Sequence, residues 1–106
     1  MINNYPLRYK LSIYLANNPR SFFILKLKMK REIDIYTSNI MRKKRLEKKW
    51  TQRQLSDYMG VSGIFINNIE SIKKPDKLNL YHINLLAEIF DCSPREFLPE
   101  KPILEK

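Results

Sequence analysis

The sequence feature that most constrains the fold is a pair of short helices separated by only three residues. Thr51 and Gln54 form a T-x-x-Q capping box, in which the Thr hydroxyl can accept the amide of the third helical residue while the Gln side chain reaches back. A helix is therefore predicted to begin at Gln52. It is predicted to end at Gly60, because a residue free to adopt positive φ suits the position after a helix.

Ser62 can cap the second helix of the pair, which is predicted to run to about Ser71. Two helices this short keep a fixed angle only if small or apolar side chains meet where they cross. The inward-facing positions carry such side chains, namely Leu55, Met59, Val61, Ile66 and Ile69. This stretch therefore predicts two crossed helices joined by a tight turn.

Further helices are predicted on both sides of the pair. One runs from about Asn39 to Lys48, with Ser38 or Asn39 as its cap. Residues 72–77 are predicted to form a charged loop. Asn79 then caps a helix that runs from Leu80 to about Phe90 and has an apolar face at positions i, i+3, i+4 and i+7. That face consists of Ile83, Leu86, Ala87 and Phe90.

A final one-turn helix is predicted at residues 93–98, where a Ser cap is followed by Pro and then Glu. The chain has 106 residues, 43% of them hydrophobic, but two Gly and one Trp give little material for a turn-rich β-sandwich. We predict an all-α protein with a compact five-helix domain at residues 38–98. A basic N-terminal extension at residues 1–37 and a short tail at residues 99–106 flank this domain.

Net charge and cysteine content narrow the class of protein. A formal charge of +9 indicates a binding partner that carries phosphate groups, either a nucleic acid or a membrane surface. The longest apolar run, residues 22–25, is too short for a membrane span or a signal sequence, so no membrane partner is expected. Cys92 is the single Cys, which excludes an internal disulfide and favours a cytoplasmic, reducing compartment.

The residues that could support catalysis are few. His82 is the only His and has no Cys or carboxylate at metal-ligand spacing, so a capping or surface role is expected. Cys92 has no neighbouring base in its local motif and is expected to act as a small buried hydrophobe. We predict that the chain is not an enzyme and has neither a cofactor nor a metal.

The segment from Thr51 to Glu70 resembles the helix-turn-helix family of phage-repressor and xenobiotic-response-element (XRE) type regulators. The family motif runs roughly T/S-Q-x-x-L-A-x-x-ϕ-G-V-S and then x-x-x-I-x-x-ϕ-E, and this chain has TQRQLSDYMGVS followed by GIFINNIE. The resemblance covers about residues 40–98. It implies a repressor-like domain that binds double-stranded DNA, with the helix at residues 62–71 in the major groove and two copies of the chain on an inverted repeat.

The resemblance also indicates which side chains contact DNA. Gln52 resembles the family residue that clamps a phosphate, at a helix N-terminus whose dipole favours an anion. Ile64 can touch a thymine methyl and Asn68 can pair with adenine, with Asn67 as the weaker candidate. The full set of predicted DNA-binding residues is Thr51, Gln52, Ser62, Gly63, Ile64, Asn67, Asn68, Lys73, Lys74, Arg42 and Lys43.

Other motif positions have structural interpretations. Arg45 and Glu70 match a family pair, which implies a buried or half-buried ion pair between the first and third helices. Phe65 is expected to pack at the core edge rather than to contact DNA. Ser56 replaces the usual Ala, and its hydroxyl needs a carbonyl one turn back. The family commonly has Gly two places after Glu70, where this chain has Ile72, which argues against the usual turn there.

Two functions remain open at this point. The first is a sequence-specific transcriptional regulator that acts as a homodimer, without a small-molecule effector because no effector domain is visible. The second is a protein-interaction module of the same fold, such as the antitoxin-like partner of a toxin–antitoxin pair, in which Ile64 and Phe65 meet protein. The basic run at residues 42–45 is either phosphate-binding or a solvated helix face, and Asn68 is either a DNA contact or solvated.

Residues 1–28 differ in composition from the rest of the chain. No acidic residue precedes Glu32, and Phe, Tyr, Ile, Asn and Lys, which share A/T-rich codons, are abundant. This composition is typical of translation through A/T-rich upstream DNA, which makes Met29 a candidate for the true start. The alternatives are a basic arm that touches DNA and a strand that pairs in a dimer.

Overall fold

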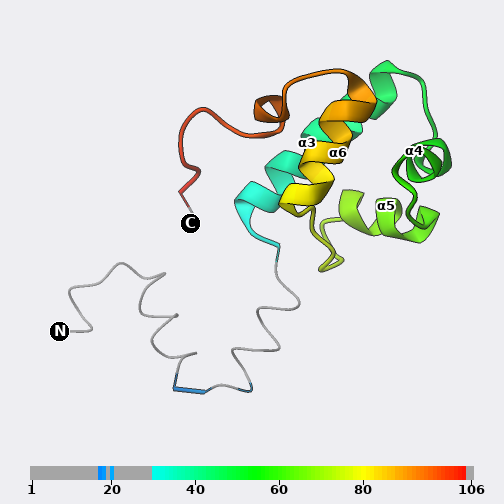
Figure 1. Cartoon of the computed structure of the whole chain (residues 1–106). Coiled ribbons are helices and arrows are strands. Elements are labelled where there is room, and N and C mark those ends of the chain that lie inside the picture. Colours follow the sequence, from blue (N-terminus) through cyan, green and yellow to red (C-terminus); the bar gives the residue numbers. More distant parts are fainter. Residues whose placement is uncertain (1–16, 19, 21–29, 105–106) are drawn as a thin grey trace.

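The computed structural model describes residues 17, 18, 20 and 30–104. The predictions for residues 1–28 and for a start at Met29 therefore fall almost entirely outside the described residues. The elements are α3 (Glu32–Glu47), α4 (Gln52–Met59), α5 (Gly63–Glu70), α6 (Leu80–Phe90) and the 3-10 helix η2 (Pro94–Phe97) (Figure 1).

The described part of the chain is an all-α domain of four α-helices and one 3-10 turn. The last of the five predicted helices is this 3-10 turn, which Ser93 caps by accepting the amide of Arg95 at 3.2 Å. In the figure, α4 and α5 lie together on one side of the domain, and the chain after η2 leads away from them (Figure 1). The predicted fold class is confirmed at this level.

The start of the first helix was predicted wrongly. The helix α3 begins at Glu32 rather than at Asn39, so residues 32–37 of the predicted extension are helical. Asp34 accepts the backbone amide of Arg31 at 2.9 Å and lies in the first turn, where an acid favours the helix dipole. Ser38 is no cap, because its hydroxyl donates to the carbonyl of Ile35 at 3.0 Å, one turn back within the helix.

The helices α4 and α5 begin where the sequence predicts. The Thr51 hydroxyl accepts the Gln54 amide at 3.0 Å, and the Gln54 side chain accepts the Thr51 amide at 2.8 Å. Gly60 has a φ of 69°, in the left-handed region, and ends α4. Ser62 caps α5 by accepting the amide of Phe65 at 3.1 Å.

The core lies where these helices meet. The helix α4 packs against α5 and α6, while α3 packs against α5 and η2. Ser56 fits at the α4–α5 crossing, because its hydroxyl donates to the carbonyl of Arg53 at 2.6 Å. The buried apolar side chains are Met41, Leu55, Met59, Ile66, Ile69, Ile83, Leu86, Ala87, Phe90 and Phe97.

An aromatic contact fixes the segment between α3 and α4. The Trp50 ring stacks on Phe90 with a centroid separation of 5.4 Å and lies 4.5 Å from the ring of Tyr58. Stacked aromatic rings at these distances stabilise beyond the area they bury. The contact therefore holds the start of α4 against the end of α6.

Candidate nucleic-acid interface

The structure brings Arg45 of α3 and Glu70 of α5 together in a buried pair. The Arg45 Nε lies 2.9 Å from Glu70 Oε2, and Nη2 lies 2.9 Å from Oε1. Both side chains are almost fully buried, at 9% and 5% exposed. The remaining Arg45 nitrogen, Nη1, donates to the carbonyl of Trp50 at 2.7 Å. The fork geometry fixes α5 relative to α3 and to the chain that leads into α4.

This pair continues as a chain of polar contacts to the surface. Gln52 Nε2 donates to Glu70 Oε1 at 3.1 Å, and Gln52 Oε1 accepts the side-chain amide of Asn67 at 3.2 Å. Asn67 is exposed, whereas Gln52 is half-buried. Gln52, the predicted phosphate-binding residue, therefore also links the buried pair to the exposed face of α5. Sequence analysis missed this link, because Gln52 and Asn67 are far apart in sequence and on different helices.

The first turn of α5 presents an exposed surface. Ser62, Gly63 and Ile64 are all exposed, and Ile64 has 74% of its surface accessible although it is apolar. A methyl group added at Gly63 would meet only the Ser56 hydroxyl, at 3.9 Å, so packing within the domain does not require glycine there. The following residue, Phe65, turns inward and packs against the core, with its ring 5.1 Å from that of His82.

The two asparagines of α5 occupy different environments. Asn67 lies on the exposed surface, while Asn68 is half-buried and its amide is 3.5 Å from Asp76 in the loop at residues 71–79. A side chain that reads a base must reach solvent on the side that meets DNA. Exposure thus favours Asn67, which sequence analysis ranked below Asn68.

The basic run at residues 42–45 divides into two kinds of side chain. Arg42 and Lys43 are exposed, and Arg42 Nε lies 3.8 Å from Glu70 Oε1, which places Arg42 beside α5. Lys44 instead pairs with Glu96 at 2.9 Å, and this hydrogen bond raises the pKa of Lys44 and lowers the pKa of Glu96. Lys44 and Arg45 are therefore held within the domain, whereas Lys43 and the largely exposed Arg42, which also pairs with Glu70, can meet an external anion.

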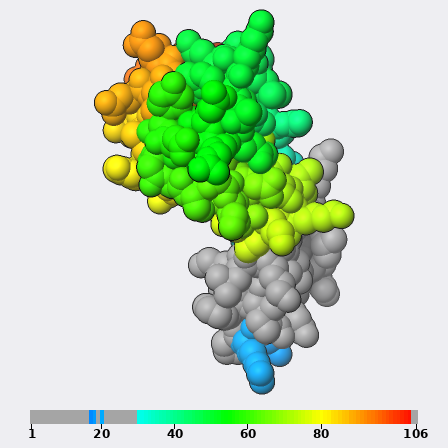
Figure 2. All heavy atoms as spheres, turned by 90° about the vertical axis from the view of Figure 1, so that its right-hand side faces the viewer, coloured from blue at the N-terminus to red at the C-terminus, as the bar shows by residue number. Residues whose placement is uncertain are grey.

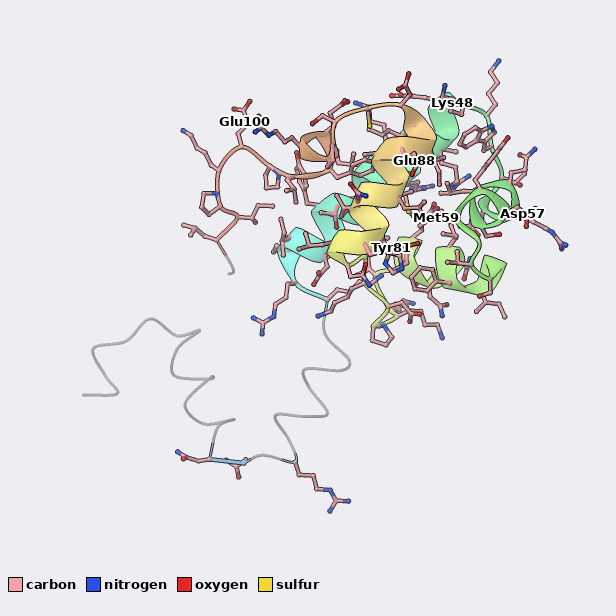
Figure 3. All side chains as sticks on the ribbon, in the orientation of Figure 1. Lys48, Asp57, Met59, Tyr81, Glu88 and Glu100 are labelled. Carbon is pink, nitrogen blue, oxygen red and sulfur yellow. The ribbon has the colours of Figure 1, made fainter. Side chains whose placement is uncertain are left out.

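Exposed groups from several segments thus lie around α5. Lys73 and Lys74 follow α5 in the loop and are exposed, as is Thr51 at the start of α4. Figure 2 shows α4, α5 and this loop together on one face of the domain. In Figure 3, Met59 points into the bundle from α4, whereas Asp57 points away from it. The surface combines cations, helix N-termini and a largely exposed first turn of α5.

Lys30 has a structural role that was not predicted from the sequence. Its ammonium donates to three backbone carbonyls at the end of α5, those of Asn68, Ile69 and Ser71. Sequence analysis placed Lys30 in the extension and assigned it no contact. The one sequence signal related to this contact was Ile72, which stands where the family commonly has Gly and so indicated that α5 does not end in a glycine turn.

His82 and Cys92 each contribute to the fold of the domain. His82 Nδ1 accepts the Asn79 amide at 3.1 Å, which completes the capping box of α6, and burial lowers the pKa of His82. Cys92 is half-buried against the core, and burial raises the pKa of its thiol. Within residues 30–104 and the three described residues before them, no group of His, Cys, Asp and Glu could hold a metal ion. No helix in that part of the chain is long and apolar enough to cross a membrane.

Two crossed helices with a three-residue turn, held by a buried Arg–Glu pair, define a helix-turn-helix domain. A family model described as Helix-turn-helix matches residues 41–97, more than half of the chain. The chain therefore belongs to the XRE-type helix-turn-helix family, which binds DNA and is not enzymatic. Searches of curated proteins and of solved structures gave no match.

Proposed function

We propose that the protein is a sequence-specific transcriptional regulator that places α5 in the major groove of DNA. The observation that carries this proposal is the division of α5 into two faces. Ile66 and Ile69 are buried in the core, whereas Gly63, Ile64 and Asn67 are exposed. An α-helix fits the major groove, where an asparagine amide can pair with adenine and an apolar side chain can contact a thymine methyl.

The surrounding residues supply contacts that do not depend on base sequence. The N-termini of α4 and α5 carry Thr51, Gln52 and Ser62, and such helix ends bind phosphate through backbone amides and the helix dipole. The exposed cations are Arg42, Lys43, Lys73 and Lys74. These groups position the domain on the sugar-phosphate backbone, and the first turn of α5 reads the bases.

We propose that two copies of the chain act together on an inverted repeat. The matched domain provides one helix of this kind per chain, and a single short helix contacts few base pairs. Proteins of this fold gain specificity by placing two such helices about one turn of DNA apart. The expected operator is therefore a pseudo-palindrome with half-sites separated by about 10 base pairs.

Selection of bound sites from a random pool of duplexes tests the proposal. We expect enrichment of a pseudo-palindromic sequence, and analytical ultracentrifugation should find two chains per enriched duplex. A pool that shows no enrichment after repeated rounds would contradict sequence-specific binding. Enrichment of a single half-site with one chain bound would retain the DNA-binding function and reject the dimer.

The exposed Ile64 favours a second candidate function, a protein-interaction module like an antitoxin. An isoleucine with 74% of its surface accessible is compatible with a protein partner as well as with DNA. The two functions differ in their dependence on salt, because DNA binding releases counterions. If no duplex binds at low salt, and a protein encoded by a neighbouring gene binds only when Ile64 is intact, the second function replaces the first.

A further inference from the structure

The end of α5 differs from the ends of the other three α-helices that the structure describes. The helices α3, α4 and α6 are each followed by a residue with positive φ, at Lys49 (60°), Gly60 (69°) and Asp91 (52°). Such a residue turns the chain back so that its amides reach the last helical carbonyls. Ser71, which follows α5, is instead extended, with φ −95° and ψ 126°.

The Lys30 side chain lies at the end of α5, where the other α-helices have a left-handed turn. Its Nζ donates to the carbonyls of Asn68 at 2.9 Å, Ile69 at 2.8 Å and Ser71 at 2.5 Å. An ammonium group has three hydrogen-bond donors, so this arrangement uses all of them. A positive charge at this point also complements the negative end of the helix dipole.

Acidic side chains support this position of Lys30. Asp34 and Asp76 lie near enough to favour its charged form, although burial lowers the pKa of Lys30 overall. Asp34 also pairs with Lys77 at 3.5 Å, and Asp76 accepts the amide of Asn68 at 3.5 Å. The start of α3, the end of α5 and the loop at residues 71–79 are thereby joined in one polar cluster.

We propose that Lys30 is a positioning residue for DNA recognition, which clamps the C-terminal end of α5 in place of a left-handed turn. This inference rests on the proposed function of α5. The helix has only eight residues, and the ends of short helices fray unless their last carbonyls are satisfied. Backbone amides reach two of the three carbonyls, since Ser71 donates to Asn68 at 3.2 Å and Lys74 donates to Ser71 at 3.4 Å, and Lys30 adds a bond to each of these and one to Ile69. Loss of the clamp loosens the turn that holds Asn67 and Asn68, so it weakens recognition of a specific sequence more than general attraction to DNA.

A phosphate contact by Lys30 is the competing explanation, and salt dependence separates the two. A lysine that binds phosphate contributes about one unit to the slope of log K against log salt, and its loss weakens all duplexes alike. A lysine whose donors are all held by carbonyls contributes nothing to that slope. Its loss lowers the ratio of specific to random binding instead.

The test uses full-length chains carrying Lys30→Met or, as a control with the same change of charge, Lys101→Met at an exposed position in the tail. In Lys30→Met, we expect amide hydrogen exchange in the last turn of α5, including Ser71, to be about tenfold faster, with exchange in α6 unchanged. Affinity for the selected duplex should fall about tenfold and affinity for a random duplex less than about twofold, with the salt slope unchanged. The control should match the wild type in every measurement.

A measurement on the unmodified chain makes the test independent of whether the variant folds. Nitrogen-15 NMR of the lysine side chains should show the Lys30 ammonium protons exchanging with water about tenfold more slowly than those of Lys101. Equal exchange rates would overturn the proposal, as would unchanged exchange in α5 of a folded Lys30→Met variant. Equal weakening of both duplexes, with the slope reduced by about one, would assign Lys30 to phosphate instead. If the wild type binds no duplex, the proposed function fails and with it the positioning role, while the exchange data still show whether the clamp exists.

Discussion

Asn67 donates its side-chain amide to the side-chain oxygen of Gln52 at 3.2 Å, which joins the exposed face of α5 to the first residue of α4. Through Gln52 this contact reaches Glu70 and the buried ion pair with Arg45. Asn67, which we propose reads a base, is thus oriented by the same network that holds α3, α4 and α5 together. Base reading and fold stability are therefore expected to respond to different members of one network.

The exposed asparagine should carry more sequence preference than its neighbour. We expect Asn67→Ala to weaken binding to the selected site by about 1–3 kcal/mol and to flatten the preference at one base pair, because a bidentate contact to adenine is lost. Asn68→Ala should have the smaller effect, since Asn68 faces Asp76. Selected-site profiles of both variants provide the measurement. A flattened profile in Asn68→Ala alone would assign adenine reading to Asn68.

Gly63→Ala tests whether DNA approaches the start of α5 closely. The added methyl group has ordinary contacts within the domain, and alanine favours helix, so we expect a change in unfolding free energy of less than about 1 kcal/mol. Affinity for the selected duplex should nevertheless fall about tenfold, because the methyl group separates the helix from the groove. Urea denaturation and fluorescence anisotropy measure the two quantities. Unchanged affinity would show that the DNA does not approach this glycine.

Removal of one member of the buried ion pair should destabilise the domain strongly. Arg45→Met leaves the Glu70 carboxylate, 5% exposed, without its bidentate partner, and breaking a buried pair in this way costs about 3–5 kcal/mol. Lys43→Met, an exposed change on the same helix, should cost less than about 0.5 kcal/mol. Denaturant midpoints of the two variants make the comparison. Similar midpoints would mean that the pair contributes no stability.

Salt dependence should reveal the phosphate contacts. If the four exposed cations, Arg42, Lys43, Lys73 and Lys74, each neutralise about one phosphate, log K against log salt should have a slope of about −3 to −4 per protomer. Anisotropy titrations from low to moderate salt give this slope. Lys74→Gln, a loop variant, should make it shallower by about one unit. A flat dependence would be inconsistent with the proposed interface.

The domain should lose stability as His82 becomes protonated. Burial lowers the pKa of His82 in the folded state, so below the unfolded value near 6.5 the unfolded chain binds more protons and stability falls as pH decreases. Protonation at Nδ1 also removes the acceptor for the Asn79 amide. The urea midpoint should therefore drop between about pH 7.5 and 5.5. His82→Gln keeps an N-x-x-Q capping box but cannot bind a proton in this range, so the urea midpoint of the variant should not drop. An equal drop in the variant would show that other groups cause the loss of stability.

Local hydrogen bonding explains why much of the fold was predictable. The capping boxes at Thr51 and Asn79 each close between residues three apart, so the sequence alone contains both partners. Gly60 likewise specifies its own left-handed turn. The start of α3 was missed because its cap, Arg31 with Asp34, is not one of the usual N-cap residue types.

The parts of the candidate site that depend on tertiary structure were less accessible to sequence analysis. The Arg45–Glu70 pair was expected only because the chain resembles a known family, while the contact between Gln52 and Asn67 was not expected at all. Sequence analysis preferred Asn68 because it lies one helical turn after Ile64. Asn67, three residues after Ile64, also lies near that face, so helical periodicity alone does not separate the two asparagines, and their different exposure depends on what packs beside each of them. Asp76, which faces Asn68, lies in a loop whose path no local rule defines.

Four of the helix starts, the turn between α4 and α5 and the family motif could be predicted from the sequence, since each depends on residues within a few positions of one another. Tertiary structure alone decided how α5 ends. Lys30 reaches the carbonyls of Asn68, Ile69 and Ser71 across 38 to 41 residues, and nothing in the sequence between them marks the contact. A backbone carbonyl is the same in every residue, so a side chain that binds carbonyls distant in the sequence meets its partners only once the helices have packed.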